Sequence, residues 1–202
     1  MRRKQCEILD HQEICRVLTG CTIGRLATLG VDGYPYITPV NFVWWQEAIY
    51  FHSAPAGEKM ENMRREPKVC FEVDVPLSYL GLGSAAHPDP CRLHQLYHCV
   101  IVRGQATLLA DAEEKARILN ALVRAHEPTA IYPPLSARTP ALSACAVVKI
   151  HPEQISAKSD LLQGKDGKRV AGIIAYLLER GEERDVQTVE AIQASQGQGN
   201  SA

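Results

Sequence analysis

Two adjacent apolar segments joined by a tight-turn sequence constrain the fold of this chain more than any other feature. Residues 22–29 read as one strand, Gly30-Val31-Asp32-Gly33 follows, and residues 34–45 read as its partner. Asp-Gly between two such segments is a strong hairpin signal. The second segment is apolar on both faces, with Trp44 and Trp45 adjacent. Neighbouring strand residues point in opposite directions, and a strand that is apolar on both faces is buried on both.

A small barrel does not by itself bury the outer face of such a strand. The pattern therefore indicates a homodimer, in which one apolar surface serves both copies. The alternative is that the segment Val170–Leu178 folds back over the same face and leaves a monomer.

Strand and helix patterns continue along the chain. Asp10 and Asp111 are expected to cap two helices, which end near Gly20 and His126. Pro76 to Cys91 reads as a long loop, and Gln193 to Ala202 as a disordered end. The other expected elements are a turn at Gln46-Glu47, strands over Ala48–Ser53, Lys68–Val73, Tyr97–Leu109 and Leu142–Ile150, and helices over Gly57–Arg65 and Val170–Leu178.

Composition excludes several classes of partner. The 202 residues carry 22 Lys plus Arg and 23 Asp plus Glu, a net charge of −1, so no basic excess points to a nucleic acid. No apolar run is long enough for a membrane span, and the N-terminal residues lack the apolar run of a secretory signal. The seven cysteines are odd in number and scattered, which favours reduced thiols and a cytoplasmic protein.

The segment from Tyr50 to Lys59 is the best candidate for a binding site from its residues alone. A strand ends at His52-Ser53, a Pro/Gly loop follows, and a helix begins near Lys59. Free N–H groups at a helix N-terminus favour a phosphate, and a serine hydroxyl and a lysine ammonium add donors. The alternative is an ordinary strand–loop–helix with an exposed lysine.

The order of these elements resembles the pyridoxamine-5′-phosphate-oxidase-like FMN-binding split barrels, and within them the 5-nitroimidazole-resistance type. The resemblance covers roughly residues 1–155. It lies in Gly24-Arg25-Leu26-Ala27-Thr28, Asp32-Gly33-Tyr34-Pro35-Tyr36, Thr38-Pro39-Val40-Asn41-Phe42, Ile49-Tyr50-Phe51-His52-Ser53-Ala54, Gly57-x-Lys59, Pro67-Lys68-Val69-Cys70-Phe71 and Val100-Ile101-Val102-x-Gly104-x-Ala106.

The resemblance implies a mainly β (α+β) fold: a six-stranded antiparallel split β-barrel of Greek-key-like topology with flanking helices. The composition changes from Ser159 onward, so the flavin-binding domain would span residues 1–158, and a C-terminal helical extension with a disordered end would span residues 159–202. The resemblance also implies a homodimer that holds FMN at the subunit interface, with FAD as the alternative cofactor.

The resemblance also assigns roles to individual residues. Thr38, Pro39, Val40 and Asn41 would line the isoalloxazine ring. His52, Ser53 and Ala54 would follow the ribityl chain, and Ser53 and Lys59 would reach the phosphate. Arg25 would contact the cofactor from the neighbouring strand, or else form a salt bridge at the barrel rim. The partner subunit would complete the site through residues such as Tyr97, His98 and Cys99.

Two departures from the family pattern limit what is carried over. Glu58 stands where many proteins of the 5-nitroimidazole-resistance type have histidine between Gly and Lys, and a C-terminal Trp-Gly-Gly-x-Arg-like signature is missing. Pyridoxamine phosphate oxidation is therefore not expected. The leading hypothesis is an FMN-dependent, nitroreductase-like oxidoreductase with a reduced electron donor and a small acceptor. The alternative is a non-catalytic or differently specialised barrel that carries flavin, F420 or haem.

Histidine and cysteine also recur in Cys91-x-x-His94-x-x-x-His98-Cys99. Thiolate and imidazole suit zinc, but on an extended strand His98 and Cys99 point to opposite faces, so we expect no metal site. His94 and His98 could instead cover the cofactor site, contact a haem or be structural. His11, His126 and His151 flank the ends of elements and are expected to be exposed or to cap them.

Overall fold

The computed structural model describes residues 3–84 and 89–198. The chain forms two compact units built from separated segments. Unit 1 comprises Met1–Leu9, Asp74–Cys99 and Ala157–Ala202, and unit 2 comprises Asp10–Val73 and Val100–Ser156. The expected division at residue 158 cuts the chain once, whereas strands β5 (Lys68–Leu80), β6 (His94–Leu108) and β7 (Ala146–Asp160) each run through both units.

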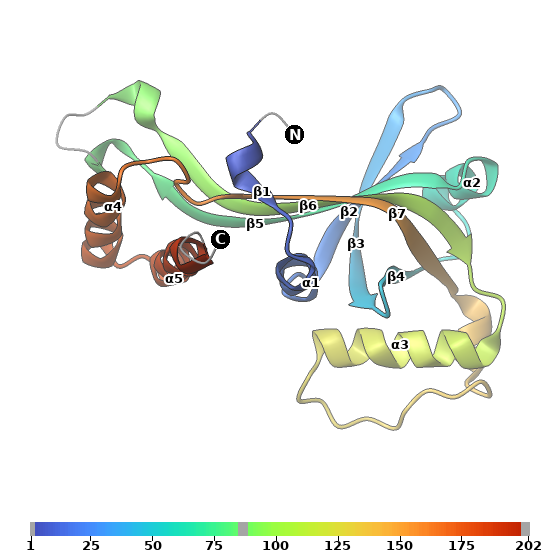
Figure 1. Cartoon of the computed structure of the whole chain (residues 1–202). Coiled ribbons are helices and arrows are strands. Elements are labelled where there is room, and N and C mark those ends of the chain that lie inside the picture. The colour runs from blue at the N-terminus through green and yellow to red at the C-terminus, as the bar shows by residue number, and fades with distance from the viewer. Residues whose placement is uncertain (1–2, 85–88, 199–202) are drawn as a thin grey trace. The chain divides into compact units, whose positions relative to one another are not determined.

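The strands form one closed sheet (Figure 1). Strands β1 (Glu7–Ile8), β2 (Ile23–Leu29), β3 (Pro35–Trp45) and β4 (Ala48–Ser53) complete the set. The order is β1-β7-β4-β3-β2-β5-β6, and a further β7–β6 pairing closes the ring. This confirms the antiparallel split barrel, with seven strands in place of the expected six because the two-residue β1 adds to β7.

The β2–β3 hairpin forms as the sequence predicts. Asp32 accepts a hydrogen bond from Tyr34 N at 3.1 Å, and Gly33 has a φ of +83°, which glycine adopts without steric cost. The register pairs Leu26 with Thr38 and Arg25 with Pro39. Leu26 therefore faces the barrel interior, and Arg25 faces outward on the alternate side.

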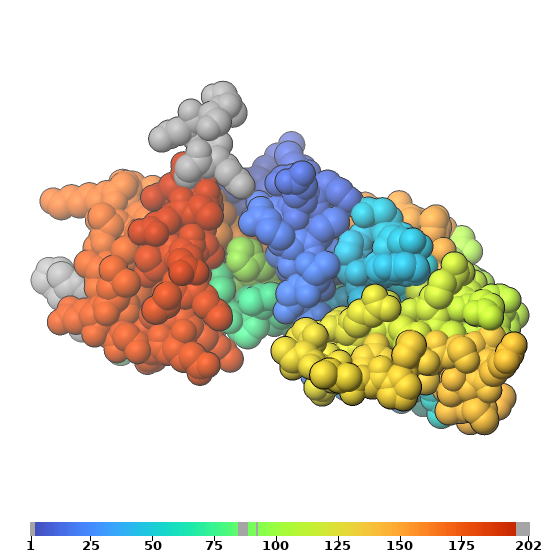
Figure 2. Space-filling view, turned by 90° about the horizontal axis from the view of Figure 1, so that it is seen from below, coloured from blue at the N-terminus to red at the C-terminus, as the bar shows by residue number. Residues whose placement is uncertain are grey.

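Helix α3 (Ala112–His126) covers the outer face of β3 and β4 (Figures 1 and 2). Trp44 is buried toward the barrel interior, and Trp45 packs outside with Ile118 and Leu122. The expectation that adjacent tryptophans face opposite ways is confirmed. The inference that Trp45 needs a second copy or the segment Val170–Leu178 to cover it is wrong, because α3 already does so.

Helices α1 (His11–Thr19) and α2 (Glu58–Arg65) complete unit 2 together with α3 and a short 3₁₀ turn at Pro140–Ala144. Asp10 accepts from Gln12 N at 3.0 Å, and Asp111 accepts from Glu114 N at 2.7 Å. Both expected caps are confirmed.

Unit 1 has its own core. Helices α4 (Gly167–Arg180) and α5 (Glu183–Gln198) contact each other and bury Ile173, Leu177 and Ile192 with leucines of β5 and β6. The expected helix at Val170–Leu178 lies within α4. No helix in the described part of the chain is long and apolar enough to cross a bilayer.

Several expected boundaries are wrong for one physical reason. Strand β5 continues past Val73 to Leu80, β6 begins at His94, and β7 runs to Asp160. Leu77, Leu80 and Leu96 are buried against α4 and α5, so a tertiary contact extends the strands. The expected loop over residues 76–91 shrinks accordingly, and residues 85–88 lie outside the described residues. Residues 193–198 are helical rather than disordered, and 199–202 are not described.

Candidate functional site

The segment that joins β4 to α2 presents main-chain N–H groups. Gly57 precedes α2 with φ +108° and ψ 164°, a conformation essentially restricted to glycine. No side chain caps this helix, and the first intrahelical bonds reach back to Gly57 O from Met60 N and Glu61 N. The N–H groups of Glu58 and Lys59 therefore have no partner in the helix.

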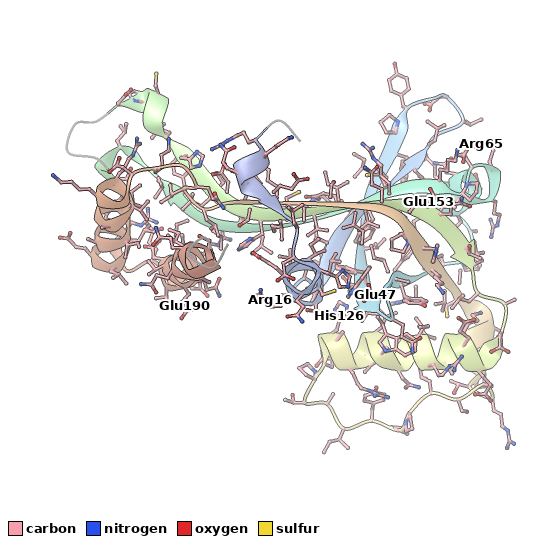
Figure 3. The ribbon with its side chains drawn as sticks, viewed as in Figure 1. Arg16, Glu47, Arg65, His126, Glu153 and Glu190 are labelled. Carbon is pink, nitrogen blue, oxygen red and sulfur yellow. The ribbon has the colours of Figure 1, made fainter. Side chains whose placement is uncertain are left out.

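The loop and helix are held firmly. Arg64 Nη2 donates to Pro55 O at 2.6 Å, which fixes the loop. Asn62 Nδ2 donates to the buried Thr28 Oγ1 at 3.1 Å, and Arg65 donates to Asn62 Oδ1 at 3.1 Å and to Leu29 O. Figure 3 labels Arg65 on this helix. The helix N-terminus is thus preorganised before any ligand arrives.

Two side-chain donors of this segment have no partner in the part of the chain that the structure describes. Ser53 is buried, and its Oγ has no hydrogen-bond partner among the described residues. An unsatisfied buried hydroxyl costs about 1–3 kcal/mol. Lys59 is half-buried, and within the described residues its ammonium forms no ion pair. A cation in the first helical turn opposes the helix dipole, and a bound anion would offset this cost. The Ser53 hydroxyl and the Lys59 ammonium are both donors that an anion can use.

The predicted flavin-lining residues divide between the two faces of the sheet. Pro39, Asn41 and His52 point outward and are exposed. Val40 and Ser53 are buried toward the interior, and Thr38 is half-buried on that side. Side chains on opposite faces cannot all touch one flat ring, so the inward-facing residues could meet it only through main-chain atoms. Ala54 lies exposed in the following loop.

A cavity of about 480 Å³ lies beside Asn41 and His52. One wall consists of apolar side chains of α3 and the following loop: Leu119, Leu122, Val123 and Leu135. His126 and Glu127 add polar groups to the cavity. Ligand pockets typically hold roughly 300–1,000 Å³ with a few polar groups. His126 Nε2 lies 3.1 Å from Phe42 O, which directs the ring toward β3 (Figure 3).

His126 was missed as a site residue because its neighbours in the cavity are distant in sequence. The available signal was the apolar face of the predicted helix, which had to pack on some strand. Since the ring is half-buried and hydrogen-bonded, the expectation that it is merely exposed or capping is corrected.

Arg25 forms the rim salt bridge that was the alternative to a cofactor contact. Its Nη1 lies 3.0 Å from Glu72 Oε2 on β5, and Arg25 pairs with Pro39 in the β2–β3 ladder. The guanidinium is half-exposed, so it stays near the outward face that carries Pro39 and Asn41.

His98 and Cys99 belong to unit 1, so the structure does not place them relative to the β3–β4 face. His98 Nδ1 lies 2.8 Å from Ser159 Oγ, and Tyr97 accepts from Lys158. His94 Nε2 lies 3.2 Å from Asp160 Oδ1. The described residues do not gather the cysteines and histidines of residues 91–99 around one point.

The family follows from a comparison of the sequence. The model of the pyridoxamine 5′-phosphate oxidase family matches residues 10–159. The chain belongs to this family. No curated protein matches the chain significantly.

Solved structures share the fold at low sequence identity. A candidate 5-nitroimidazole antibiotic resistance protein of Bacteroides thetaiotaomicron is 24% identical with a TM-score of 0.64, over 75% of this chain and 85% of that one. The flavocytochrome Anf3 of Azotobacter vinelandii is 20% identical with a TM-score of 0.67, over 85% and 77%. An FAD and heme binding protein of Mycobacterium smegmatis is 13% identical with a TM-score of 0.67, over 82% and 78%.

Proposed function

We propose that this protein is an FMN-dependent oxidoreductase that passes electrons from a reduced donor to a small acceptor. The observation that carries the proposal is the buried, unpartnered Ser53 hydroxyl, in the same segment as the uncapped α2 N-terminus and Lys59. Hydroxyl, ammonium and main-chain N–H groups together suit a phosphate monoester. FAD would fit the same donors through its pyrophosphate.

The part of the outer face of β3 and β4 that α3 leaves exposed would carry the ring system. Pro39, Asn41 and His52 are available there, and the adjoining cavity of about 480 Å³ would take the acceptor. Bound FMN would supply the redox chemistry, while the protein binds, orients and excludes water. Nitroaromatic compounds are the acceptor class that the family resemblance suggests, supported by the fold shared with the Bacteroides protein.

Replacing Lys59 by alanine is expected to weaken FMN binding. Loss of a charge-assisted hydrogen bond is worth about 1.5–3 kcal/mol, or roughly 10- to 150-fold in dissociation constant. Titration of flavin-free protein, followed by flavin fluorescence, measures it. Lys68→Ala is the matched control, because Lys68 lines a different cavity of unit 2. Equal affinity of Lys59→Ala and the parent, or a larger loss in Lys68→Ala, would place the phosphate elsewhere.

The same holoprotein tests the redox step. A reduced nicotinamide should bleach the flavin absorbance without oxygen, and a nitroaromatic compound should restore it. If no donor reduces the bound flavin, the protein is a carrier rather than an enzyme.

We further propose a homodimer, for a reason other than Trp45. Ile23, Leu29 and Ile37 are 57%, 45% and 62% exposed on one outward face of β2 and β3. That face continues to Pro39 and Asn41, so a second copy laid over it would also enclose the ring system. Exposed apolar patches of this kind mark interfaces in soluble proteins.

Ile37→Glu should convert the dimer to a monomer and weaken flavin binding, because the charge would be buried at the two-fold contact. Light scattering gives the molar mass, and Ile131→Glu, at a fully exposed loop position, should change neither property. A parent monomer that binds flavin stoichiometrically contradicts the interface model.

A haem-binding or F420-binding carrier is the second candidate function. His94, Arg3, Lys165 and Arg169 surround a small cavity of about 200 Å³ in unit 1. Its volume is below that of a haem pocket, but its cationic side chains would suit the carboxylates at a haem edge. The folds shared with a flavocytochrome and an FAD and heme binding protein also favour it. The absorption spectrum of the purified protein distinguishes a Soret band from flavin bands.

Seven free cysteines support the proposed cytoplasmic location.

A further inference from the structure

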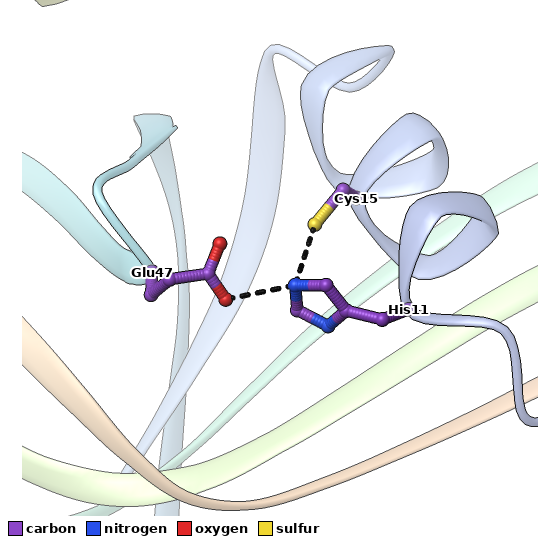
Figure 4. A group of neighbouring side chains, drawn as sticks. All are labelled: His11, Cys15 and Glu47. Atoms are coloured by element: carbon purple, nitrogen blue, oxygen red, sulfur yellow. Dashed lines mark hydrogen bonds and ion pairs between the residues drawn. The ribbon is translucent and has the colours of Figure 1, made fainter.

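Three potential metal ligands from two elements of unit 2 meet at one point (Figure 4). Cys15 Sγ lies 3.5 Å from His11 Nε2, and Glu47 Oε2 lies 3.0 Å from the same nitrogen. The three ligand atoms all lie within 4.8 Å of one another. Among the described residues this is the one group of three such side chains.

Local structure brings the three side chains together. His11 and Cys15 are four residues apart on α1 and therefore lie on one face of the helix. Glu47 lies in the two-residue turn between β3 and β4, where Gln46 and Glu47 have φ values of +47° and +58°. Helix α1 packs on β3, which sets the turn opposite the helix face.

The contacts do not form a catalytic triad. In a triad the base uses one ring nitrogen for the nucleophile and the other for the carboxylate. Here Cys15 and Glu47 both approach Nε2 of His11. One nitrogen cannot donate to the carboxylate and accept from the thiol at the same time, whereas a metal ion can take the nitrogen, the thiolate and the carboxylate together as ligands.

The separations match those around a tetrahedral ion. Zn–S of about 2.3 Å and Zn–N of about 2.0 Å at tetrahedral angles place sulfur and nitrogen roughly 3.5 Å apart. Oxygen and nitrogen ligands lie roughly 3.3 Å apart on the same basis. The distances of 3.5 Å and 3.0 Å are close to these values.

We propose that His11, Cys15 and Glu47 bind a divalent transition-metal ion of the zinc class. A thiolate with an imidazole and a carboxylate favours zinc over magnesium or calcium. The side chains of His11 and Glu47 are 60% and 65% exposed, so solvent supplies the fourth ligand. The ion joins α1 to the β3–β4 turn, and the site is separate from the segment proposed to bind the flavin phosphate.

Titration of the full-length protein with Zn²⁺ against a chromogenic chelator tests the site. We expect one strongly bound ion per chain. Cys15→Ser, His11→Ala and Glu47→Gln should each weaken Zn²⁺ binding at least about tenfold. Even residues that only hydrogen-bond to a metal ligand change metal affinity by about this factor. Co²⁺ in the parent protein should absorb in the red, where oxidised flavin does not, and the Cys15→Ser variant should lose this absorption.

Matched controls are available on the same chain. Cys91→Ser removes an exposed cysteine of unit 1, and Glu13→Gln removes another carboxylate from α1; both should bind Zn²⁺ as the parent does. Parent affinity in Cys15→Ser or His11→Ala, or an equal loss in Cys91→Ser, overturns the proposal. Because the readouts do not involve flavin, the proposed redox function can fail without affecting this result.

Discussion

Asp185→Asn is expected to destabilise unit 1 by about 3–5 kcal/mol, the usual effect of removing one partner from a buried ion pair. Asp185 is 1% exposed. Arg180 Nε donates to its Oδ2 at 2.9 Å, and Nη2 donates to its Oδ1 at 2.5 Å. Ser78 Oγ donates to Oδ1 at 2.6 Å, and Glu182 N donates to Oδ2 at 2.9 Å.

This network joins α4 and α5 to strand β5. Ser78 N donates to Thr188 Oγ1 at 2.9 Å, and Arg180 Nη1 donates to Tyr79 O at 2.9 Å. An asparagine side chain has the same shape as Asp185, but it lacks the negative charge, and its amide NH₂ is a donor where the carboxylate has a second acceptor oxygen. The Arg180 guanidinium is then left partly buried without its carboxylate.

The pH dependence follows from the same contacts. The Arg180 hydrogen bonds lower the pKa of Asp185 from 3.8 to about 2, while burial acts in the opposite direction. The pKa of Asp185 is lower in the folded than in the unfolded protein. The carboxylate therefore makes its full contribution to the stability of the folded protein above pH 3.8. This contribution is lost as the pH falls through the folded value.

Urea unfolding, with hydrogen exchange of α4 and α5 amides as the local readout, measures the effect. The difference in free energy of unfolding between the parent and Asp185→Asn should be large at neutral pH and should shrink below pH 3.8. Glu183→Gln, in the first turn of the same helix, should stay within about 0.5 kcal/mol of the parent. A difference that persists unchanged to pH 2 would show that packing rather than charge holds the helices.

The sequence predicts the elements whose signals are local. Caps at Asp10 and Asp111, the turn at Asp32-Gly33 and the apolar periodicity of β2 and β3 each act within a few residues, and each is confirmed. The strand ends beyond Val73 and before Tyr97 depend on packing against α4 and α5. No local pattern carries that information.

The candidate site likewise has a part that local sequence signals predict and a part that depends on tertiary packing. The Ser53–Lys59 segment is contiguous, so its strand–loop–helix form was predictable, and the structure has it. The cavity wall that includes His126 joins α3 to strands some 75–85 residues earlier in the chain. Cys15 and Glu47 are likewise 32 residues apart, and only the packing of α1 on β3 brings them together.

Gly104→Ala is expected to destabilise unit 2 by about 1–3 kcal/mol or more, as overpacking does in other cores. Gly104 lies on β6 where the main chain of β7 passes closely. A Cβ built on it would lie 2.1 Å from His151 O and 2.9 Å from His151 C. These are backbone atoms held by the closed sheet, so they cannot relieve the clash by a change of rotamer as a flexible side chain could.

Gly172→Ala provides a control, because this substitution is expected to raise stability where Gly104→Ala lowers it. Gly172 is exposed within α4, and a Cβ there meets no atom within 4 Å. Alanine in a helix interior is favoured over glycine by roughly 0.5–1 kcal/mol, so this variant should be more stable than the parent. Urea midpoints of the two variants, with hydrogen exchange of β6 and β7 amides, provide the comparison. If Gly104→Ala matches the parent, β6 and β7 can separate by more than the closed sheet implies, and the barrel is less rigid than its main-chain contacts indicate.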